Sequence, residues 1–312
     1  MTVTRVDVPE GYRVLDLPAS PALAISFARA GLRAAGVGGG GKDLPRTVLH
    51  LPGVHVDRAH VARYARLVGA ADGGPLPLLY PNALSFPLQM ALMTAPAFPF
   101  PVIGLVHLEN VVRQRRGLVA SAPLDLEVRA ENLRPHRLGR VLDVVTVVRQ
   151  GGHVAWTQVG TFLRRGGGGT DAGTAGAPPR GAGTDRSTGG ADDAALHRIG
   201  SWTLDGGLGR AYGAVAGDRN PIHLYPLTAK AFGFPRPIAH GLWTAARLTH
   251  AVDAGMSAAV ECAATFRKPV PLPSTVDVLA DRTPGTGEGP LHAQVRRRTG
   301  EVCCDLRLTP TT

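Results

Sequence analysis

The sequence predicts an α+β protein in which one chain carries two copies of the same unit, a long helix followed by an antiparallel meander of strands. Three observations support this prediction. A Gly-rich stretch divides the chain near its middle, the two halves share a spacing of Asp, Tyr and Gly residues, and each half has a helix-like apolar stretch followed by four strand-like runs. The length of 312 residues is enough for two domains of ordinary size or for one large domain.

The dividing stretch runs from residue 166 to 193 and consists mainly of Gly, Ala, Thr and Asp. It has no apolar period and nothing to bury, so we expect a flexible linker. It separates a first unit at residues 49–165 from a second unit at residues 194–312. Residues 1–48 precede the first unit as an N-terminal extension. We expect a peripheral helix there that starts at Ser20-Pro21, with Ser as the N-cap and Pro as the first helical residue.

The two halves repeat one spacing in phase. In both, an Asp is followed by a Tyr seven residues later and by a Gly twelve residues later. A helix-like apolar stretch comes next, at residues 81–93 in the first half and at residues 237–252 in the second. The repeated residues are Asp57, Tyr64 and Gly69 in the first half, matched by Asp205, Tyr212 and Gly217 in the second.

Four runs rich in β-branched residues follow each predicted helix, separated by short turn signals. A long helix and an antiparallel meander, used twice, give the α+β class, because each sheet must bury one face on its helix. The runs cover residues 105–112, 124–130, 141–149 and 153–163 in the first half, and residues 258–267, 275–280, 291–297 and 301–308 in the second.

The composition and charge of the chain bear on whether it binds nucleic acid or a membrane. The formal net charge is +10, but the basic residues are scattered along the chain and no nucleic-acid-binding module is recognisable. We therefore expect no nucleic-acid partner. A composition rich in Arg, Ala and Gly is also typical of a GC-rich coding sequence. No run of about 18 apolar residues exists, which predicts no membrane partner and no membrane span.

The cysteine usage and the first residues bear on the compartment. The first 30 residues lack an uninterrupted apolar core, so we expect no secretory signal. Cys262, Cys303 and Cys304 are too few for a disulfide framework and lack the paired spacing of a zinc site. A reducing, cytoplasmic location and the absence of a metal are therefore expected.

Residues suited to catalysis gather in the second half. Asn220-Pro221 predicts a helix start, so His223 falls in the first turn of a short helix that ends near Gly233. Asp218 lies in the loop just before this helix. A carboxylate and an imidazole that share one water are suited to adding or removing that water by general acid–base chemistry.

A second helix start is predicted at Pro237, which would open the long helix through His240 and Gly241. Free backbone N–H groups at such a helix end can hold a developing oxyanion. Gly241 has no side chain to prevent a carbonyl group from approaching, so we regard its N–H as the candidate oxyanion donor.

The order of these residues resembles the hydratase motif of the MaoC-like dehydratases, the R-specific enoyl-thioester hydratases of the hotdog fold. The resemblance covers about residues 196–310. The first half, about residues 49–165, is similar to the degenerate hotdog of the double-hotdog members. The residues that carry the resemblance are Asp218, Asn220, Pro221, Ile222, His223, Gly233, Phe234 and the run Pro237-Ile238-Ala239-His240-Gly241.

The resemblance implies a tandem (double) hotdog that reversibly adds water to a trans-2-enoyl thioester, giving an R-3-hydroxyacyl thioester, in fatty acid metabolism. It implies that Asp218 and His223 form a catalytic dyad around one water, with Asn220 orienting the loop and touching that water. The N–H of Gly241 would polarise the thioester carbonyl, and His240 would be the second residue of this oxyanion and substrate-binding site. Coenzyme A or acyl carrier protein would be the handle of the substrate, and the resemblance implies no cofactor and no metal.

The first copy lacks the dyad. When the two repeats are aligned, Ala70 stands at the position of Asp218, and Pro75 stands at the position of His223. We therefore expect one active site per chain and a pseudo-dimer of the two units. Further pairing into a homodimer is left open.

Two other functions remain open at this point: a non-catalytic subunit that binds acyl thioesters, and a hotdog thioesterase. Single residues also have simpler explanations. Asn220 would serve as a helix cap alone, His240 as a structural histidine, and Gly241 as a point of close packing. The sequence leaves open the acyl chain length, the choice between coenzyme A and acyl carrier protein, and the direction of the reaction.

Overall fold

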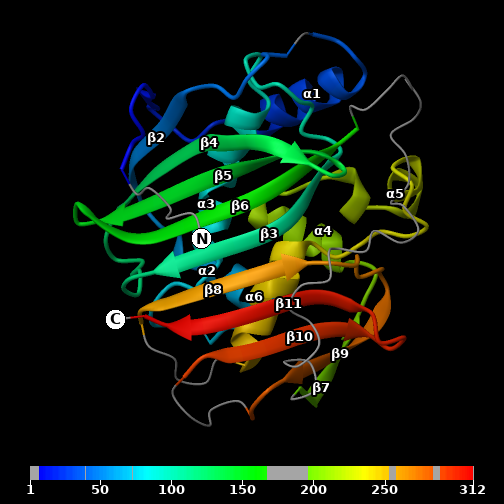
Figure 1. Ribbon diagram of the computed structural model, residues 1–312. Coiled ribbons are helices and arrows are strands. Elements are labelled where there is room, and N and C mark those ends of the chain that lie inside the picture. Colours follow the sequence, from blue (N-terminus) through cyan, green and yellow to red (C-terminus); the bar gives the residue numbers. More distant parts are fainter. Residues whose placement is uncertain are drawn as a thin grey trace. The chain divides into compact units, whose positions relative to one another are not determined.

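The computed structural model divides the chain into two compact units (Figure 1). The first unit comprises residues 1–62 and 73–169, and the second comprises residues 63–72 and 170–312. The predicted linker at residues 166–193 lies outside the described residues except for Gly166. The residues that the structure describes are 7–38, 40–71, 73–166, 196–252, 258–283 and 289–311.

The strands of the first unit follow the order β1-β2-β4-β5-β6-β3. Strands β4, β5 and β6 form an antiparallel meander, as the sequence predicts, but β3 pairs with β6 and not with the next strand β4, so the expected meander of four strands is wrong at its first member. Each of the four strands ends later than its apolar run suggests. The short strand β1 comes from the N-terminal extension and pairs in parallel with β2, so the extension contributes to this sheet. The strands are β1 (Arg13–Asp16), β2 (Thr47–Val54), β3 (Leu105–Gln114), β4 (Leu124–His136), β5 (Gly139–Gln150) and β6 (His153–Arg165).

The central helix of the first unit, α3 (Tyr80–Met93), packs against β4 and β5. Pro81 lies in its first turn, where the missing N–H has no intrahelical partner to lose. Polar side chains on this buried helix are hydrogen-bonded to the sheet. Asn82 donates to Gln158 of β6, and Gln89 donates to Thr146 of β5. These bonds remove most of the cost of burying the amides.

The peripheral helix of the N-terminal extension, α1 (Leu23–Ala34), begins later than the sequence suggests. The predicted start at Ser20-Pro21 is wrong, because the N-cap position is Ala22, whose backbone is extended. Ser20 lies two residues before that cap and no longer occupies the position from which a side chain caps the first turn. The helix contacts α3 of the same unit.

The strands of the second unit follow the order β8-β11-β10-β9-β7. All four pairings are antiparallel, and β8 to β11 correspond to the four runs that the sequence predicts. The central helix, α6 (Gly241–Val252), contacts β10 and β11. The strands are β7 (His197–Leu204), β8 (Val260–Phe266), β9 (Ser274–Ala280), β10 (Leu291–Arg297) and β11 (Val302–Pro310).

The start of α6 corrects a second expectation. Pro237 does not open the helix, because residues 237–239 are held in an extended conformation by the segment before β9. The N–H of Ala239 donates to the carbonyl of Val270 at 2.8 Å, and Ile238 forms an antiparallel bridge with Pro271. A backbone engaged in this pairing cannot also be helical, so α6 begins at Gly241.

The repeated spacing corresponds to two helices, α2 (Arg58–Val68) and α4 (Leu208–Ala216). Gly69 and Gly217 follow these helices in the left-handed conformation, with φ values of 72° and 82°, which glycine adopts without strain. The rings of Tyr64 and Tyr212 lie 6.0 Å apart in the second unit. No helix in the described part of the chain is long and apolar enough to cross a membrane.

Candidate active site

The loop between α4 and α5 carries the predicted acid and imidazole. Asn220 is the N-cap of a 3₁₀ turn, η2 (Pro221–His223), and its Oδ1 accepts a hydrogen bond from the N–H of Ile222 at 3.4 Å. The cap and the proline at the first position are as the sequence predicts. They put His223 at the end of a single tight turn, five residues after Asp218.

The short helix expected to run from Pro221 to Gly233 is interrupted. The chain leaves η2 after His223 and re-enters a helix at α5 (Pro226–Ala231). Tyr225 has an extended backbone with φ −138° and ψ 150°, as steric clash with the ring of Pro226 requires. The prediction of one continuous helix is therefore wrong.

His223 is buried and is held by one strong hydrogen bond. Its Nδ1 lies 2.7 Å from the carbonyl oxygen of Ile238, which can only accept, so Nδ1 donates and carries the proton. In the neutral ring Nε2 is then a free base. Burial lowers the pKa of His223 below 6.5, against the opposing effects of the Asp218 carboxylate and the Ile238 carbonyl. The imidazole is therefore neutral at physiological pH.

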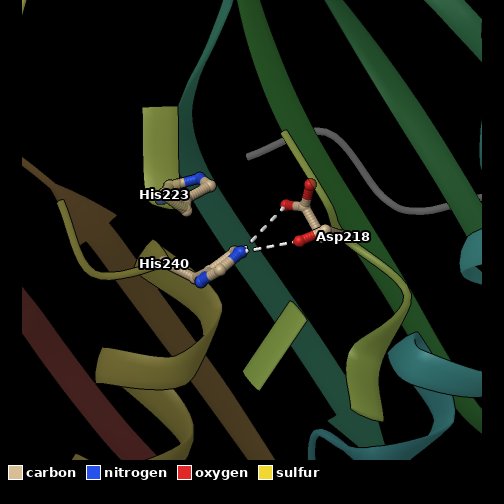
Figure 2. A group of neighbouring side chains, drawn as sticks. All are labelled: Asp218, His223 and His240. Atoms are coloured by element: carbon tan, nitrogen blue, oxygen red, sulfur yellow. Dashed lines mark hydrogen bonds and ion pairs between the residues drawn. The ribbon is translucent and has the colours of Figure 1, made fainter. Parts of the chain in front are cut away.

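Asp218 is the partly exposed member of the group, with 32% of its side chain accessible. Its Oδ1 accepts a hydrogen bond from the N–H of Asn220 at 3.1 Å, which fixes the carboxylate on the loop. One polar atom of Asp218, one of His223 and one of His240 lie within 4.8 Å of one another (Figure 2). Of the five predicted site residues, these three therefore gather at one point.

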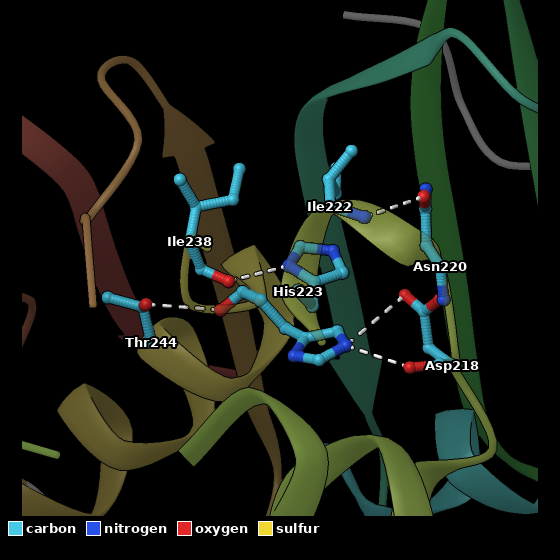
Figure 3. A network of polar contacts seen from close by, with 7 residues as sticks. Asp218, Asn220, Ile222, His223, Ile238 and Thr244 are labelled. Carbon is cyan, nitrogen blue, oxygen red and sulfur yellow. Dashed lines mark hydrogen bonds and ion pairs between the residues drawn. The ribbon is translucent and has the colours of Figure 1, made fainter. Parts of the chain in front are cut away.

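His240 packs against both His223 and Asp218 (Figure 2), and the ring of His223 is turned to the Ile238 carbonyl (Figure 3). Its ring stacks on that of His223 with a centroid distance of 3.7 Å and an interplanar angle of 25°. Its Nε2 donates to the backbone carbonyl of Asp218 at 2.9 Å and lies 3.9 Å from the carboxylate Oδ2. Burial, reinforced by His223, holds the pKa of His240 well below 6.5. His240 thus acts as a neutral donor to the loop that carries Asp218.

Gly241 is the first residue of α6. The first hydrogen bond of this helix runs from the N–H of Thr244 to the carbonyl of His240, so the N–H groups of Gly241, Leu242 and Trp243 precede the intrahelical ladder. The position is also a tight one, because a Cβ at Gly241 would lie 3.0 Å from the ring of Phe266. Both functions considered for this glycine, donor and packing point, are therefore compatible with its geometry.

Three residues that sequence reasoning did not assign to the site support it from α4. A Cβ at Gly209 would lie 2.0 Å from the carbonyl oxygen of His223, and one at Gly213 would lie 2.6 Å from that of Asp218. Tyr212 is buried, and its ring lies 4.9 Å from that of His240. Burial, together with Tyr64, raises its pKa well above 10.0, so its hydroxyl stays protonated. The sequence feature that could have pointed to these residues is the pair of glycines four residues apart, which puts both on one face of α4.

Asp218, His223 and His240 are the one group in the described ranges whose His, Cys, Asp or Glu atoms are close enough together to hold a metal ion. Two neutral imidazoles and a carboxylate form a ligand set that zinc accepts. His240, however, uses its Nε2 to donate to the Asp218 carbonyl, and that bond would have to break before Nε2 could bind a metal. The hydrogen bond to the Asp218 carbonyl therefore competes with metal binding at Nε2 of His240.

The sequence of the chain is similar to a known domain family and to a known enzyme. Residues 207–294 match the model of the MaoC like domain. The chain is 40% identical over 233 residues to the 3-hydroxyacyl-thioester dehydratase X of Mycobacterium tuberculosis (strain ATCC 25618 / H37Rv), covering 75% of this chain and 79% of that protein.

Solved structures give the same result for the fold. The crystal structure of HtdX of Mycobacterium tuberculosis is similar with a TM-score of 0.70 and 34% identity, over 85% of this chain and 100% of that chain. A MaoC-like dehydratase from Phytophthora capsici is similar in fold, with a TM-score of 0.64 and 19% identity, over 85% of this chain and 95% of that chain. The predicted α+β class with two hotdog units in one chain is confirmed.

Proposed function

The chain belongs to the MaoC-like dehydratase family, and from this premise we propose that it interconverts trans-2-enoyl thioesters and R-3-hydroxyacyl thioesters by adding or removing one water at Asp218 and His223. One observation carries the proposal: a neutral imidazole, with Nδ1 bonded to a carbonyl and Nε2 left as a base, gathered with a carboxylate on a single loop. This pair is suited to general acid–base catalysis.

In the hydration direction the proton balance requires two groups. Nε2 of His223 takes a proton from water as the water oxygen bonds to the β-carbon, and the α-carbon receives a proton from the Asp218 carboxyl group, so the step requires one proton on the pair at its start. A proton transfer from His223 to Asp218 then restores the starting state. Dehydration is the reverse: the Asp218 carboxylate removes the α-proton, and the His223 imidazolium protonates the departing hydroxyl group.

The thioester carbonyl has to accept negative charge during either reaction. The N–H groups at the start of α6, first that of Gly241, are the proposed donors, since a helix N-terminus stabilises an oxyanion. Asn220 caps the turn that holds His223, and His240 fixes the backbone of Asp218. We propose one such site per chain, because the first repeat has Ala70 and Pro75 at the positions of the dyad.

Hydration of crotonyl-CoA tests this function directly. The enoyl absorbance should fall with wild-type protein, and chiral analysis should give the R product. Asp218→Asn and His223→Gln should each reduce kcat by about a hundredfold to ten-thousandfold in protein that is still folded. The exposed Asp205 and His197 provide matched controls, as Asp205→Asn and His197→Gln, which should retain activity.

Two results would reject the proposal. Unchanged turnover in both dyad variants would remove Asp218 and His223 from the mechanism. Release of a free thiol from saturated acyl-CoA, detected with a thiol-reactive dye, would point instead to a thioesterase.

A further inference from the structure

The helix α5 presents large apolar side chains to solvent beside the candidate active site. Leu227 is 81% exposed and Tyr225, just before the helix, is 53% exposed. No other large apolar residue in the described part of the chain is as exposed as Leu227. Covering Leu227 with a partner would remove its apolar surface from water, which favours binding.

Positively charged residues are concentrated in the same stretch of the chain, between β7 and α6. Arg210, Arg219, Lys230 and Arg236 are all exposed, and none forms an ion pair with a carboxylate within the described ranges. Between the end of β7 and the start of α6 the sequence has only two acidic residues, Asp205 and Asp218, and the second of these belongs to the site. The surface therefore combines an apolar centre with uncompensated positive charge.

Two side chains of this stretch, Arg210 and Tyr225, hold each other in place. The guanidinium of Arg210 lies 5.2 Å from the ring centroid of Tyr225 and donates to the carbonyl of Leu224 at 2.9 Å. Leu227 and Lys230 are three residues apart and therefore share one face of α5. Arg210 and Tyr225 are already held together, so these two side chains lose little entropy when a partner binds.

The surface is joined directly to the catalytic turn. Thr228 of α5 donates from Oγ1 to the carbonyl oxygen of Pro221 at 2.7 Å, and Pro221 begins the turn that carries His223. Pro221 lies two residues before His223 in this turn. A protein docked on α5 would therefore lie close enough to the imidazole to deliver a substrate carried on a flexible arm.

We infer that the surface formed by Arg210, Tyr225, Leu227 and Lys230 docks an acidic carrier protein that presents the acyl thioester on a phosphopantetheine arm. The inference rests on the proposed function and specifies which thioester the site receives. Acidic residues of the carrier would pair with Arg210 and Lys230, and an apolar side chain would cover Leu227. Coenzyme A supplies phosphates for the cations, but it has no apolar side chain of this kind to bury Leu227.

Two thioesters of one acyl group, on acyl carrier protein and on coenzyme A, test the inference. Leu227→Glu and Lys230→Glu should each lower kcat/KM for the carrier-protein thioester by about tenfold or more, and the double variant by more, because both changes oppose an acidic partner. The kcat/KM for the coenzyme A thioester should stay within about twofold of wild type. Arg298→Glu is the matched charge reversal in the β10–β11 turn and should change neither value.

A binding measurement separates this inference from the proposed reaction. Titration of ¹⁵N-labelled bacterial holo acyl carrier protein, which has the arm but no acyl group, with wild-type protein should shift carrier amide signals, and the Leu227→Glu variant should abolish the shifts. Binding that fails while coenzyme A thioesters are turned over overturns the docking surface alone. Equal loss of both thioester activities in the Lys230→Glu variant also overturns it and assigns Lys230 to the coenzyme A phosphates.

Discussion

The ring of His240 lies on the face of His223, 3.7 Å between centroids, while its Nε2 holds the backbone carbonyl of Asp218 at 2.9 Å. One side chain therefore contacts both of the groups that we propose share the proton transfers. Because burial keeps both imidazoles neutral, the stacked rings do not repel each other. A second positive charge at this place would be strongly unfavourable in a buried site.

The role of His240 as a positioning residue can be separated from a structural one. His240→Phe keeps a flat ring against His223 but loses the donor to Asp218, so kcat should fall by about ten- to a hundredfold with KM nearly unchanged. His240→Gln offers an amide donor and should recover part of the activity. A loss of kcat in both variants that follows their melting temperatures would show that His240 only stabilises the fold.

The pH dependence of activity follows from the pKa of His223. Burial lowers this pKa below 6.5, so the neutral base persists below pH 6.5. The limb of the kcat/KM profile for hydration that reports the His223 base should therefore lie below pH 6.5. A decline with an apparent pKa at or above 6.5 in the pH–rate profile would contradict a buried imidazole base.

Stability should depend on pH in the same direction. In the unfolded chain His223 and His240 take up protons with a pKa of 6.5, whereas burial in the folded chain lowers both pKa values. Their contribution to the free energy of unfolding is therefore complete above pH 6.5 and is lost as the pH falls below it. Urea unfolding between pH 5 and 7.5 measures this, and in the His223→Gln variant the slope should be smaller.

The glycines of α4 set how closely this helix approaches the site. Gly213→Ala would place a Cβ 2.6 Å from the carbonyl of Asp218, so it should lower the free energy of unfolding by about 1–3 kcal/mol and reduce activity. Gly31→Ala in α1 is the matched control, because a Cβ there meets nothing within 4 Å. That change should be neutral or stabilising. Equal melting temperatures for the two variants would refute the packing role of Gly213.

The cap at Asn220 should be detectable separately from catalysis. Asn220→Ala removes the acceptor for the Ile222 N–H and should cost about 1 kcal/mol of unfolding free energy, with a lower kcat from a looser turn. Asn220→Ser keeps a capping oxygen and should retain most of both. If Asn220→Ser folds like wild type but loses activity as fully as Asn220→Ala, then Asn220 contacts the reacting water directly.

The sequence by itself determined the features that depend on near neighbours in the chain. Asn220 and Pro221 form the predicted cap and turn because the groups involved are two residues apart. The strand runs follow their β-branched composition, and the motif puts Asp218 and His223 on one loop. The same local reasoning failed at Pro237, where pairing of Ile238 and Ala239 with a segment some 30 residues away prevents the helix from starting.

Only the tertiary structure decided what His240 and the α4 glycines do. His240 lies 22 residues from Asp218, and no local pattern states that its Nε2 meets that carbonyl or that its ring covers His223. The depressed pKa values of both histidines have the same origin, since burial is a property of the packed unit and not of the motif. The order of residues in the motif determines that Asp218 and His223 lie on one loop. The packing of the unit determines how far apart these groups are and keeps both imidazoles neutral.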